Sequence, residues 1–278
     1  VRGSATSRPL PDILAEAEHL IKSGFLEIIL TGINISRYEW EGKGLSDLLE
    51  SLVTMDGIFR IRISSLEPDN LDHKLLQIIA HPKICRHIHL CLQSGSDKIL
   101  SAMKRVYNFQ YFCSAVQKIR KIDRFFNITT DIIVGFPGET FDDFNASLKA
   151  IPILEFGDVH VFPYSTRNGT VAAKLPGQID NKEKKSRAAE IQKIADRKKL
   201  DFYNSMVGET LFVLVEKEFE IDQQKFAYGY SDNYCPVYIE IQENTIVYNQ
   251  LIETHINDAS PQGLKGKLIK KPVVGSLG

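Results

Sequence analysis

Residues 127–144 read NITTDIIVGFPGETFDDF, and the rest of the chain can be interpreted outward from this stretch. Apolar and polar residues alternate from Asn127 to Val134, which is the period of a β-strand. Gly135 and Gly138 then break the chain, and Thr140 is placed to cap a helix. The glycines let the backbone approach a ligand closely at the carboxyl end of the strand, where such folds bind ligands. The stretch predicts a strand–loop–helix unit; an ordinary connecting turn and a ligand-binding loop both remain open.

The same alternation of helix and strand runs through the first two thirds of the chain. Apolar residues at helical spacing predict helices at 11–23, 45–55, 71–80, 110–122 and 141–151. Short apolar or alternating runs predict strands at 26–32, 59–64, 87–92, 127–134 and 158–162. This rhythm indicates βα units, hence a parallel sheet or barrel. Because the chain begins on a helix, we expect at least one preceding strand to be missing.

The predicted strands share polar residues on one face. The polar positions are Asn127, Thr129, Asp131, Arg60, Arg62, Ser64, His87, His89, Cys91, Gln93, Asp158, His160 and Tyr164. Strands that each offer one polar face, with apolar residues toward the helices, predict a barrel with a polar lumen.

A metal site is a weaker interpretation of one of these strands. Cys85, His87, His89 and Cys91 all lie on one side of it. Alternate residues of a strand are about 6.6 Å apart and rarely converge on one small ion, so we expect lumen-lining residues and no metal site.

Composition places the chain among soluble globular proteins, with 278 residues, 43% hydrophobic and 25% charged, and a formal net charge of −1. No apolar run approaches the roughly 20 residues that span a bilayer, and no signal peptide is evident, so we expect a cytoplasmic protein with no membrane partner. Its four cysteines are too few and scattered for a disulfide framework. Any attraction to nucleic acid must come from local patches.

One such patch is the helix predicted at 180–206. Between residues 182 and 199 it carries eight basic and three acidic residues. A charged helix is most often a solvated face, but this one could also contact phosphates.

After Gly208 the chain becomes a series of short strand-like runs, which predicts a small all-β module, plausibly a barrel. Its aromatic residues, which could stack on RNA bases or form the barrel core, are Phe226, Tyr228, Tyr230, Tyr234 and Tyr238. From Val207 onward ten acidic and six basic side chains argue against a site driven by phosphates.

The glycine-rich loops and their neighbours resemble those of the MiaB-like radical-SAM tRNA methylthiotransferases. The matching segments, in the order of the family, are TGIN (31–34), ISSLEP (63–68), LQSGSD (92–97), M-x-R-x-Y (103–107), TDIIVGFPGET (130–140) and HVFPYSTRNGT (160–170). ISSLEP and HVFPYS are most similar to the MtaB branch, which modifies threonylcarbamoyladenosine next to the anticodon. The C-terminal module resembles a TRAM domain, with GYSDNY (229–234) as its best match.

The resemblance implies the fold class α/β, with a partial radical-SAM (TIM-like) βα barrel in residues 1–175, a basic linker helix in 176–206 and a TRAM-like β-barrel in 207–278. It implies S-adenosylmethionine and [4Fe–4S] clusters as cofactors, and tRNA (its anticodon loop), a reductant and a sulfur donor as partners. The residues it implies around S-adenosylmethionine are Gly32, Asn34, Ser64, Glu67, Gln93 and Gly135. Those it implies nearer the substrate are Arg105, Tyr107, Tyr164 and Arg167.

The chain departs from the family in its cysteines. The family binds its radical cluster with C-x-x-x-C-x-x-C after the first barrel strand, and this sequence contains no such triplet. The three cysteines of the family's N-terminal domain also have no counterpart here. We therefore expect a truncated form whose own activity is doubtful and that has no catalytic side chain of its own. A non-catalytic RNA-binding remnant and a cluster-free βα-barrel enzyme using His89 or His160 remain as alternatives.

Overall fold

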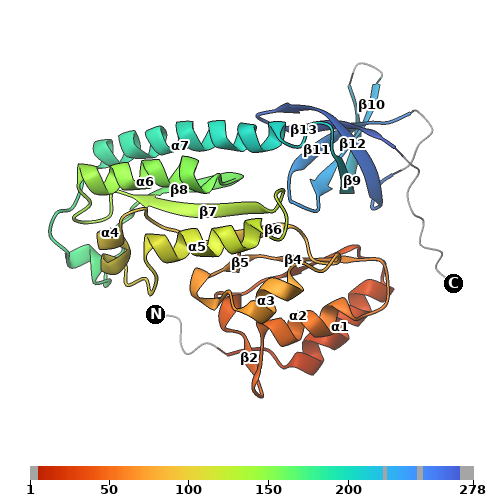
Figure 1. The fold of residues 1–278 in the computed structure, drawn as a ribbon, viewed down its shortest axis with the longest axis horizontal. Helices are drawn as coiled ribbons and strands as arrows, with labels where there is room; N and C mark the ends of the chain where they lie inside the picture. Colours follow the sequence, from red (N-terminus) through yellow and green to blue (C-terminus); the bar gives the residue numbers. More distant parts are fainter. Residues whose placement is uncertain (1–5, 222–223, 243–246, 270–278) are drawn as a thin grey trace. The chain divides into compact units, whose positions relative to one another are not determined.

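The computed structural model describes residues 6–221, 224–242 and 247–269, and the chain divides into two compact units (Figure 1). Unit 1 comprises Val1–Ile88 and Met206–Gly278, and unit 2 comprises His89–Ser205. The strand β6 (His87–Leu90) runs across this division of the chain. The domain limits expected at 175 and 206 stay a prediction.

The N-terminal part of unit 1 pairs two parallel strands with amphipathic helices. Its elements are α1 (Leu10–Lys22), β1 (Glu27–Leu30), η1 (Ile35–Arg37), β2 (Glu39–Trp40), β3 (Lys43–Gly44), α2 (Leu45–Val53), β4 (Arg60–Ile63), β5 (Ser65–Leu66), η2 (Pro68–Asn70) and α3 (His73–Ile78). β1 and β4 pair in parallel with Leu30 opposite Ile63. α2 buries Leu45, Leu49 and Leu52, the apolar stripe that predicted it.

The C-terminal part of unit 1 is a closed five-stranded barrel, which confirms the predicted all-β module. Its strands, joined in the order β10-β11-β13-β12-β9, are β9 (Thr210–Ile221), β10 (Gln224–Ser231), β11 (Pro236–Glu240), β12 (Leu251–Ser260) and β13 (Gly263–Leu268). Small aliphatic side chains such as Val213, Ala227 and Val237 are fully buried inside it. Because alternate residues of a strand face opposite sides, the residues between them lie on the outer face.

Unit 2 is built on the opening stretch of the sequence analysis. Its elements after β6 are α4 (Asp97–Ala102), α5 (Phe109–Arg120), β7 (Asn127–Val134), α6 (Phe141–Leu154), β8 (Asp158–Pro163), η3 (Ala172–Lys174) and α7 (Asn181–Asn204). β7 and β8 pair in parallel with Asp131 opposite His160, which confirms the predicted parallel α/β fold. Figure 1 shows α6 and α7 side by side along β8.

The loop at the end of β7 leads into α6 as predicted. Thr140 and Asp143 form a capping box, in which Asp143 Oδ2 accepts from the Thr140 N–H at 2.9 Å and Thr140 Oγ1 accepts from the Asp143 N–H at 3.3 Å. Gly95, in the LQSGSD segment, allows that segment to lie close to the backbone of α6. A Cβ on Gly95 would lie 2.5 Å from the carbonyl oxygen of Ala146 in α6. Gly95 is thus explained by helix packing, without a ligand.

Among the residues that the structure describes, none of the helices combines the length and the apolar character needed to cross a bilayer.

Candidate active site

Two predicted site residues, Asn34 and Ser64, follow the carboxyl ends of the paired strands β1 and β4 in unit 1. The Ser64 N–H donates to the carbonyl of Leu30 at 3.1 Å, so the segment after β4 starts beside the end of β1. Ser64 Oγ and Asn34 Oδ1 are buried and have no hydrogen-bond partner among the described residues. Buried polar atoms are nearly always satisfied, and leaving one unpaired costs about 1–3 kcal/mol. Two such oxygens after adjacent strands indicate a ligand with polar groups.

The remaining predicted residues of unit 1 lie in the same two loops. Glu67 is half-buried, and its N–H donates to Ser36 Oγ at 2.9 Å, which ties the loop after β4 to η1. Gly32 is exposed, and a Cβ there would lie 2.6 Å from Cγ2 of Ile35, so a larger residue would displace the Ile35 side chain.

Arg60 and Arg62 do not line an open lumen, and that part of the prediction is wrong. Arg60 Nε and Arg62 Nε donate to the Glu27 carboxylate at 2.6 and 2.8 Å. Arg60 also donates to the carbonyls of Tyr230 at 3.0 Å and Phe212 at 3.3 Å, in strands of the C-terminal barrel. The side chains of Arg60 and Arg62 are only 7% and 6% exposed, and Arg60 joins the barrel to the strand pair.

Tyr234 and Glu27 complete this network. The Arg62 guanidinium lies 3.7 Å from the centroid of the Tyr234 ring. Burial opposes a charge on Glu27, but its bonds to Arg62 and Arg60 outweigh burial and hold the pKa of Glu27 below its ordinary value. Arg60 and Arg62 therefore share the Glu27 carboxylate within unit 1, while Nη1 of Arg62 is buried without a hydrogen-bond partner among the described residues.

In unit 2, Gln93, Gly135 and Tyr164 follow three neighbouring strands. The Gln93 N–H donates to the carbonyl of Asp131 at 2.8 Å, and its own carbonyl accepts from Ile133 at 2.9 Å. Gln93 has φ +71°, a conformation that is rare for a residue other than glycine and that concentrates at functional sites. The Tyr164 N–H donates to the carbonyl of Val134 at 2.8 Å, so β8 ends beside β7.

Gly135 has a structural explanation that the sequence did not show. Its φ is +73°, and a Cβ there would collide with the side-chain stem of Lys184 from α7. The space that we expected a ligand to fill is therefore occupied by Lys184. The Lys184 ammonium lies 5.2 Å from the centroid of the Tyr164 ring, and the Tyr164 hydroxyl is buried without a partner among the described residues.

The other predicted substrate residues differ in exposure. Tyr107 is 6% exposed, and its hydroxyl donates to the carbonyl of Cys91 at 2.5 Å, so it supports the loop after β6. Arg105 is half-buried, and Arg167 is exposed in the loop after β8. Contact of these residues with a substrate stays a prediction.

The polar face of β6, β7 and β8 is present in unit 2 as predicted. His89 Nδ1 lies 3.0 Å from Thr129 Oγ1, and His89 Nε2 lies 3.3 Å from the Asp131 carboxylate. The His160 ring stacks on the His89 ring with centroids 5.6 Å apart. Burial opposes a charge on His89, but hydrogen bonds to Asp131 and Cys91 outweigh burial and raise the pKa of His89 to about 9. The pairing of β7 with β6 and β8 creates this cluster, and no single-strand pattern could have shown it.

The cysteines of the chain do not resemble a cluster-binding set. Burial raises the pKa of Cys85 to about 12, which keeps it a thiol. Among the described residues no three cysteines come together, and the group that could bind a metal contains Cys91 alone. Iron–sulfur clusters are ligated by several thiolates, so these residues do not fit a [4Fe–4S] cluster.

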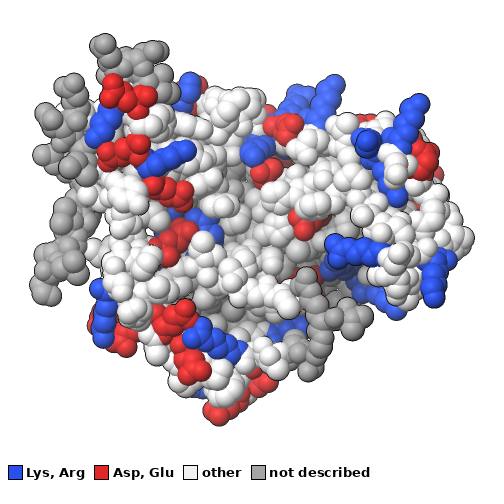
Figure 2. Space-filling view, turned by 180° about the vertical axis from the view of Figure 1, so that it is seen from behind, with Lys and Arg blue, Asp and Glu red and all other residues white. Residues whose placement is uncertain are grey.

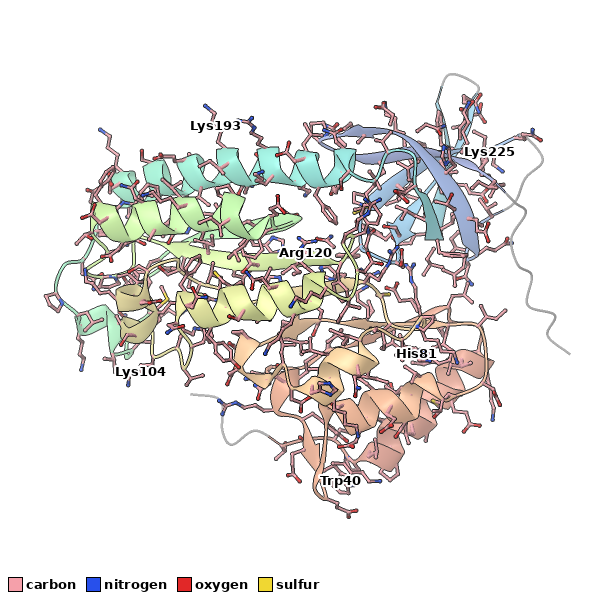
Figure 3. The ribbon with its side chains drawn as sticks, in the orientation of Figure 1. Trp40, His81, Lys104, Arg120, Lys193 and Lys225 are labelled. Atoms are coloured by element: carbon pink, nitrogen blue, oxygen red, sulfur yellow. The ribbon has the colours of Figure 1, made fainter. Side chains whose placement is uncertain are left out.

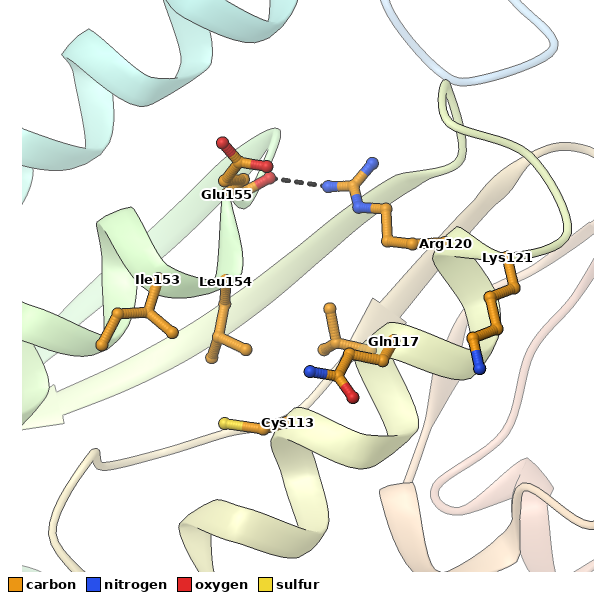
Figure 4. Close-up of a pocket in the computed structure, with 8 residues that line it drawn as sticks. Cys113, Gln117, Arg120, Lys121, Ile153, Leu154 and Glu155 are labelled. Carbon is orange, nitrogen blue, oxygen red and sulfur yellow. Dashed lines mark hydrogen bonds between the residues drawn. The ribbon is translucent and has the colours of Figure 1, made fainter.

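A cavity of about 390 Å³ between α5 and α6 lies apart from the predicted residues (Figure 4). Arg120 borders it and donates to the carbonyls of Glu155 at 2.7 Å and Phe126 at 2.5 Å. The guanidinium thus closes the carboxyl end of a helix, which is a structural role.

Some basic side chains of the helix α7 are buried or paired within unit 2. Lys184 and Arg187 are buried, and Arg187 donates to Glu139 at 2.6 Å, while Lys199 pairs with Asp158 at 2.7 Å. Lys193 points away from α6 in Figure 3. The exposed basic residues are Lys182, Lys185, Lys193 and Arg197. Over much of the face in Figure 2, basic side chains lie among acidic ones. That α7 contacts phosphates through these four exposed residues stays a prediction.

The aromatic residues of the C-terminal barrel are not its core. Each of the five is half-buried or exposed, and they lie on the outer face. Tyr228 lies 5.0 Å from Tyr238 and 5.6 Å from Tyr230, and Tyr230 stacks on Tyr234 at 4.8 Å between ring centroids. The four tyrosine rings contact one another in series, and Phe226 joins them through Phe219, which lies 5.7 Å from Phe226 and 6.4 Å from Tyr238. We call Phe226, Tyr228, Tyr230, Tyr234 and Tyr238 the aromatic strip.

Comparison with known families supports the resemblance seen in the sequence. Residues 1–151 match the family model described as the Radical SAM superfamily. The solved structure of coproporphyrinogen III oxidase from Escherichia coli, titled a radical SAM enzyme, aligns with a TM-score of 0.46 and 17% identity over 55% of this chain and 36% of that one.

The similar curated proteins include members of two branches of tRNA-modifying enzymes. A tRNA-2-methylthio-N(6)-dimethylallyladenosine synthase of Endomicrobium trichonymphae is 38% identical over 78% of this chain and 52% of its own length. The threonylcarbamoyladenosine tRNA methylthiotransferase MtaB of Bacillus subtilis is 34% identical over 88% of this chain and 55% of its own length. The MtaB protein of Chlamydia pneumoniae is 36% identical over 97% of this chain and 63% of its own length. The chain thus spans just over half to less than two thirds of these relatives.

Proposed function

The chain belongs to the radical SAM superfamily, and we propose that it is the S-adenosylmethionine- and tRNA-binding part of a tRNA methylthiotransferase. Relatives at 34–38% identity carry that activity in their names. We propose further that the substrate is N6-threonylcarbamoyladenosine next to the anticodon, because ISSLEP and HVFPYS are most similar to the MtaB branch. A reductant and a sulfur donor are the further partners that such a reaction requires.

The unpartnered oxygens of Asn34 and Ser64 are the observation that carries the proposal. S-adenosylmethionine offers an ammonium, a carboxylate and ribose hydroxyls, which match an amide acceptor and a hydroxyl that can donate or accept. Glu67 would bind a further polar group from the loop after β4, and a contact of Gln93 in unit 2 with the cofactor stays a prediction. The residues of the loops after β1 and β4 would bind and orient S-adenosylmethionine, whereas the N–H of Gly135 donates to Glu139 and the space beside Gly135 is filled by Lys184.

Titration calorimetry of the 278-residue chain with S-adenosylmethionine tests this assignment. We expect Ser64→Ala and Asn34→Ala each to weaken binding about tenfold, or about 1.4 kcal/mol, because each removes a hydrogen bond in a buried site. Ser51→Ala is the matched control, since the Ser51 hydroxyl donates to the carbonyl of Asp47 in its own helix. An unchanged affinity in both site variants would refute the assignment, and a parent chain that does not bind S-adenosylmethionine would refute the cofactor proposal itself.

The choice of branch is tested in the source cell. We expect deletion of the reading frame to remove the 2-methylthio derivative of N6-threonylcarbamoyladenosine from tRNA digests analysed by mass spectrometry. Loss of the dimethylallyl derivative alone would move the chain to the other branch. If both derivatives persist, the methylthiotransferase proposal fails.

The aromatic strip supports tRNA as the macromolecular substrate. Rings on an outer face stack on unpaired bases, and each stacked base contributes about 1–3 kcal/mol. Lys217 lies 4.7 Å from the centroid of the Tyr228 ring and adds a positive charge to this surface. We expect Tyr228→Ala to weaken binding of fluorescently labelled tRNA in an anisotropy titration. Tyr248→Ala is the control, because Tyr248 is exposed in the same barrel and outside the strip. Equal affinities of the two variants would exclude the strip from the tRNA site.

A further inference from the structure

His89, Cys91 and Asp131 form a three-residue group in unit 2 that the proposed function does not use. One ligand atom from each, an imidazole nitrogen, a thiol sulfur and a carboxylate oxygen, lies within 4.8 Å of the other two. All three side chains are half-buried. His89 lies in β6, Cys91 follows β6 directly, and Asp131 lies in the neighbouring strand β7. Among the described residues, this is the group of histidine, cysteine and acidic residues with metal-binding spacing.

The orientation of His89 is set by a second residue. Its Nδ1 lies 3.0 Å from Thr129 Oγ1, which leaves Nε2 facing Asp131 at 3.3 Å. Histidines that bind metals commonly direct the second ring nitrogen to a polar partner in this way, since that contact fixes the tautomer and the ring plane.

A simple ion pair between His89 and Asp131 is the competing explanation. An ion pair explains His89 and Asp131, to which Cys91 adds a hydrogen bond with His89. A nitrogen, a sulfur and an oxygen donor together are instead the donor set of a borderline-soft ion such as Zn²⁺. Metal–ligand bonds of about 2.0–2.3 Å in a tetrahedron place ligand atoms about 3.5 Å apart. The observed 3.3 Å between His89 and Asp131 already matches that separation.

We propose that His89, Cys91 and Asp131 bind one Zn²⁺ ion, with the fourth coordination position open. The exposed His160 ring stacks on the His89 ring, with the ring centroids 5.6 Å apart. Zinc sites with three protein ligands leave the fourth position to water or to a substrate heteroatom. None of the three ligands is among the residues proposed for S-adenosylmethionine, so the metal site and the proposed function can be tested independently.

Titration of the reduced, tag-free 278-residue chain with Co²⁺ after removal of metals tests the proposal. Co²⁺ occupies tetrahedral zinc sites and reports a thiolate ligand by a charge-transfer band. We expect one equivalent of Co²⁺ to bind with that band and Zn²⁺ to displace it. Cys91→Ser should abolish the band, and His89→Gln and Asp131→Asn should each weaken binding at least tenfold.

Cys113→Ser is the matched control, because Cys113 is a half-buried thiol on α5 outside the group. It should bind Co²⁺ as the parent does. Circular dichroism establishes that each variant is folded, and His89→Gln decides the question if Cys91→Ser does not fold. A parent chain without the band, or a band that persists in both Cys91→Ser and His89→Gln, overturns the site.

Discussion

Two strand faces of this protein carry the same kind of sequence pattern and serve different ends. On β4 in unit 1, Arg60 and Arg62 share the Glu27 carboxylate, and Arg60 also binds carbonyls of the C-terminal barrel. On β6 and β7 in unit 2, His89 and Asp131 pair at 3.3 Å and remain 15% and 27% exposed. The first face is closed by internal partners, and the second keeps ligand atoms accessible. A polar face on a predicted strand therefore indicates a function only when its partners are known.

The largest loss of stability is expected from Glu27→Gln, which removes the carboxylate shared by Arg60 and Arg62 on β4. The substitution leaves two buried guanidinium groups without their shared charge, and removing one member of a buried ion network costs about 3–5 kcal/mol. Urea unfolding of the chain measures this loss. Glu18→Gln, at an exposed pair with Lys22, is the control and should leave stability unchanged. A Glu27→Gln chain as stable as its parent would mean that the network is not structural.

Within unit 2, Asp143 differs from Asp131 in the number of its partners. The Asp131 carboxylate pairs with His89, whereas the Asp143 carboxylate accepts hydrogen bonds from three residues. These donors are Ser96 Oγ, Lys98 Nζ and Thr140. Burial opposes its charge, but the bonds to Lys98 and Ser96 outweigh burial and hold the pKa of Asp143 far below its ordinary value. We expect Asp143→Asn to cost about 1.5–3 kcal/mol at pH 7.

The pH dependence of that cost follows from the sign of the shift. A lowered pKa stabilises the fold above the unfolded-state value of about 4 and loses that contribution as the pH falls toward the folded value. The stability difference between parent and Asp143→Asn should be constant from pH 7 to about 5 and shrink below about 4. Unfolding curves across this range measure it, and a difference that grows on acidification would contradict the assignment.

A smaller loss of stability is expected from Tyr234→Ala, which removes the ring that covers Arg62 on β4. The ring covers Arg62 and stacks on Tyr230, contacts that contribute about 1 kcal/mol together at a site 41% exposed. Thermal unfolding compares this variant with Tyr248→Ala, whose ring is 61% exposed. Equal melting temperatures for the two variants would show that Arg62 does not need its aromatic cover.

The smallest effect is expected from His160→Ala on the open face. His160 is exposed and contacts His89 through ring stacking alone among the described interactions, so stability should change by less than about 0.5 kcal/mol. The measurement is urea unfolding in EDTA, which excludes any contribution from bound metal. A loss above about 1 kcal/mol would show that the open face is as structural as the closed one.

Local pattern was sufficient to determine most elements of this protein from its sequence. The strand predicted at 127–134 is observed at Asn127–Val134, and Thr140 caps the helix after it. Both rest on periodicity and capping, which depend on residues within a few positions of one another. The similarity to radical SAM methylthiotransferases was also readable, because it rests on short contiguous loops.

The tertiary structure alone decided which polar residues face partners and which remain open. Arg60 and His89 have the same alternation in sequence, but the partner of Arg60 lies 33 residues away in Glu27, and the partner of His89 lies in Asp131. Lys184 fills the space beside Gly135 from a helix almost 50 residues further along the chain. Strand pairing and helix docking create these contacts over long sequence separations, which a pattern within one segment does not encode.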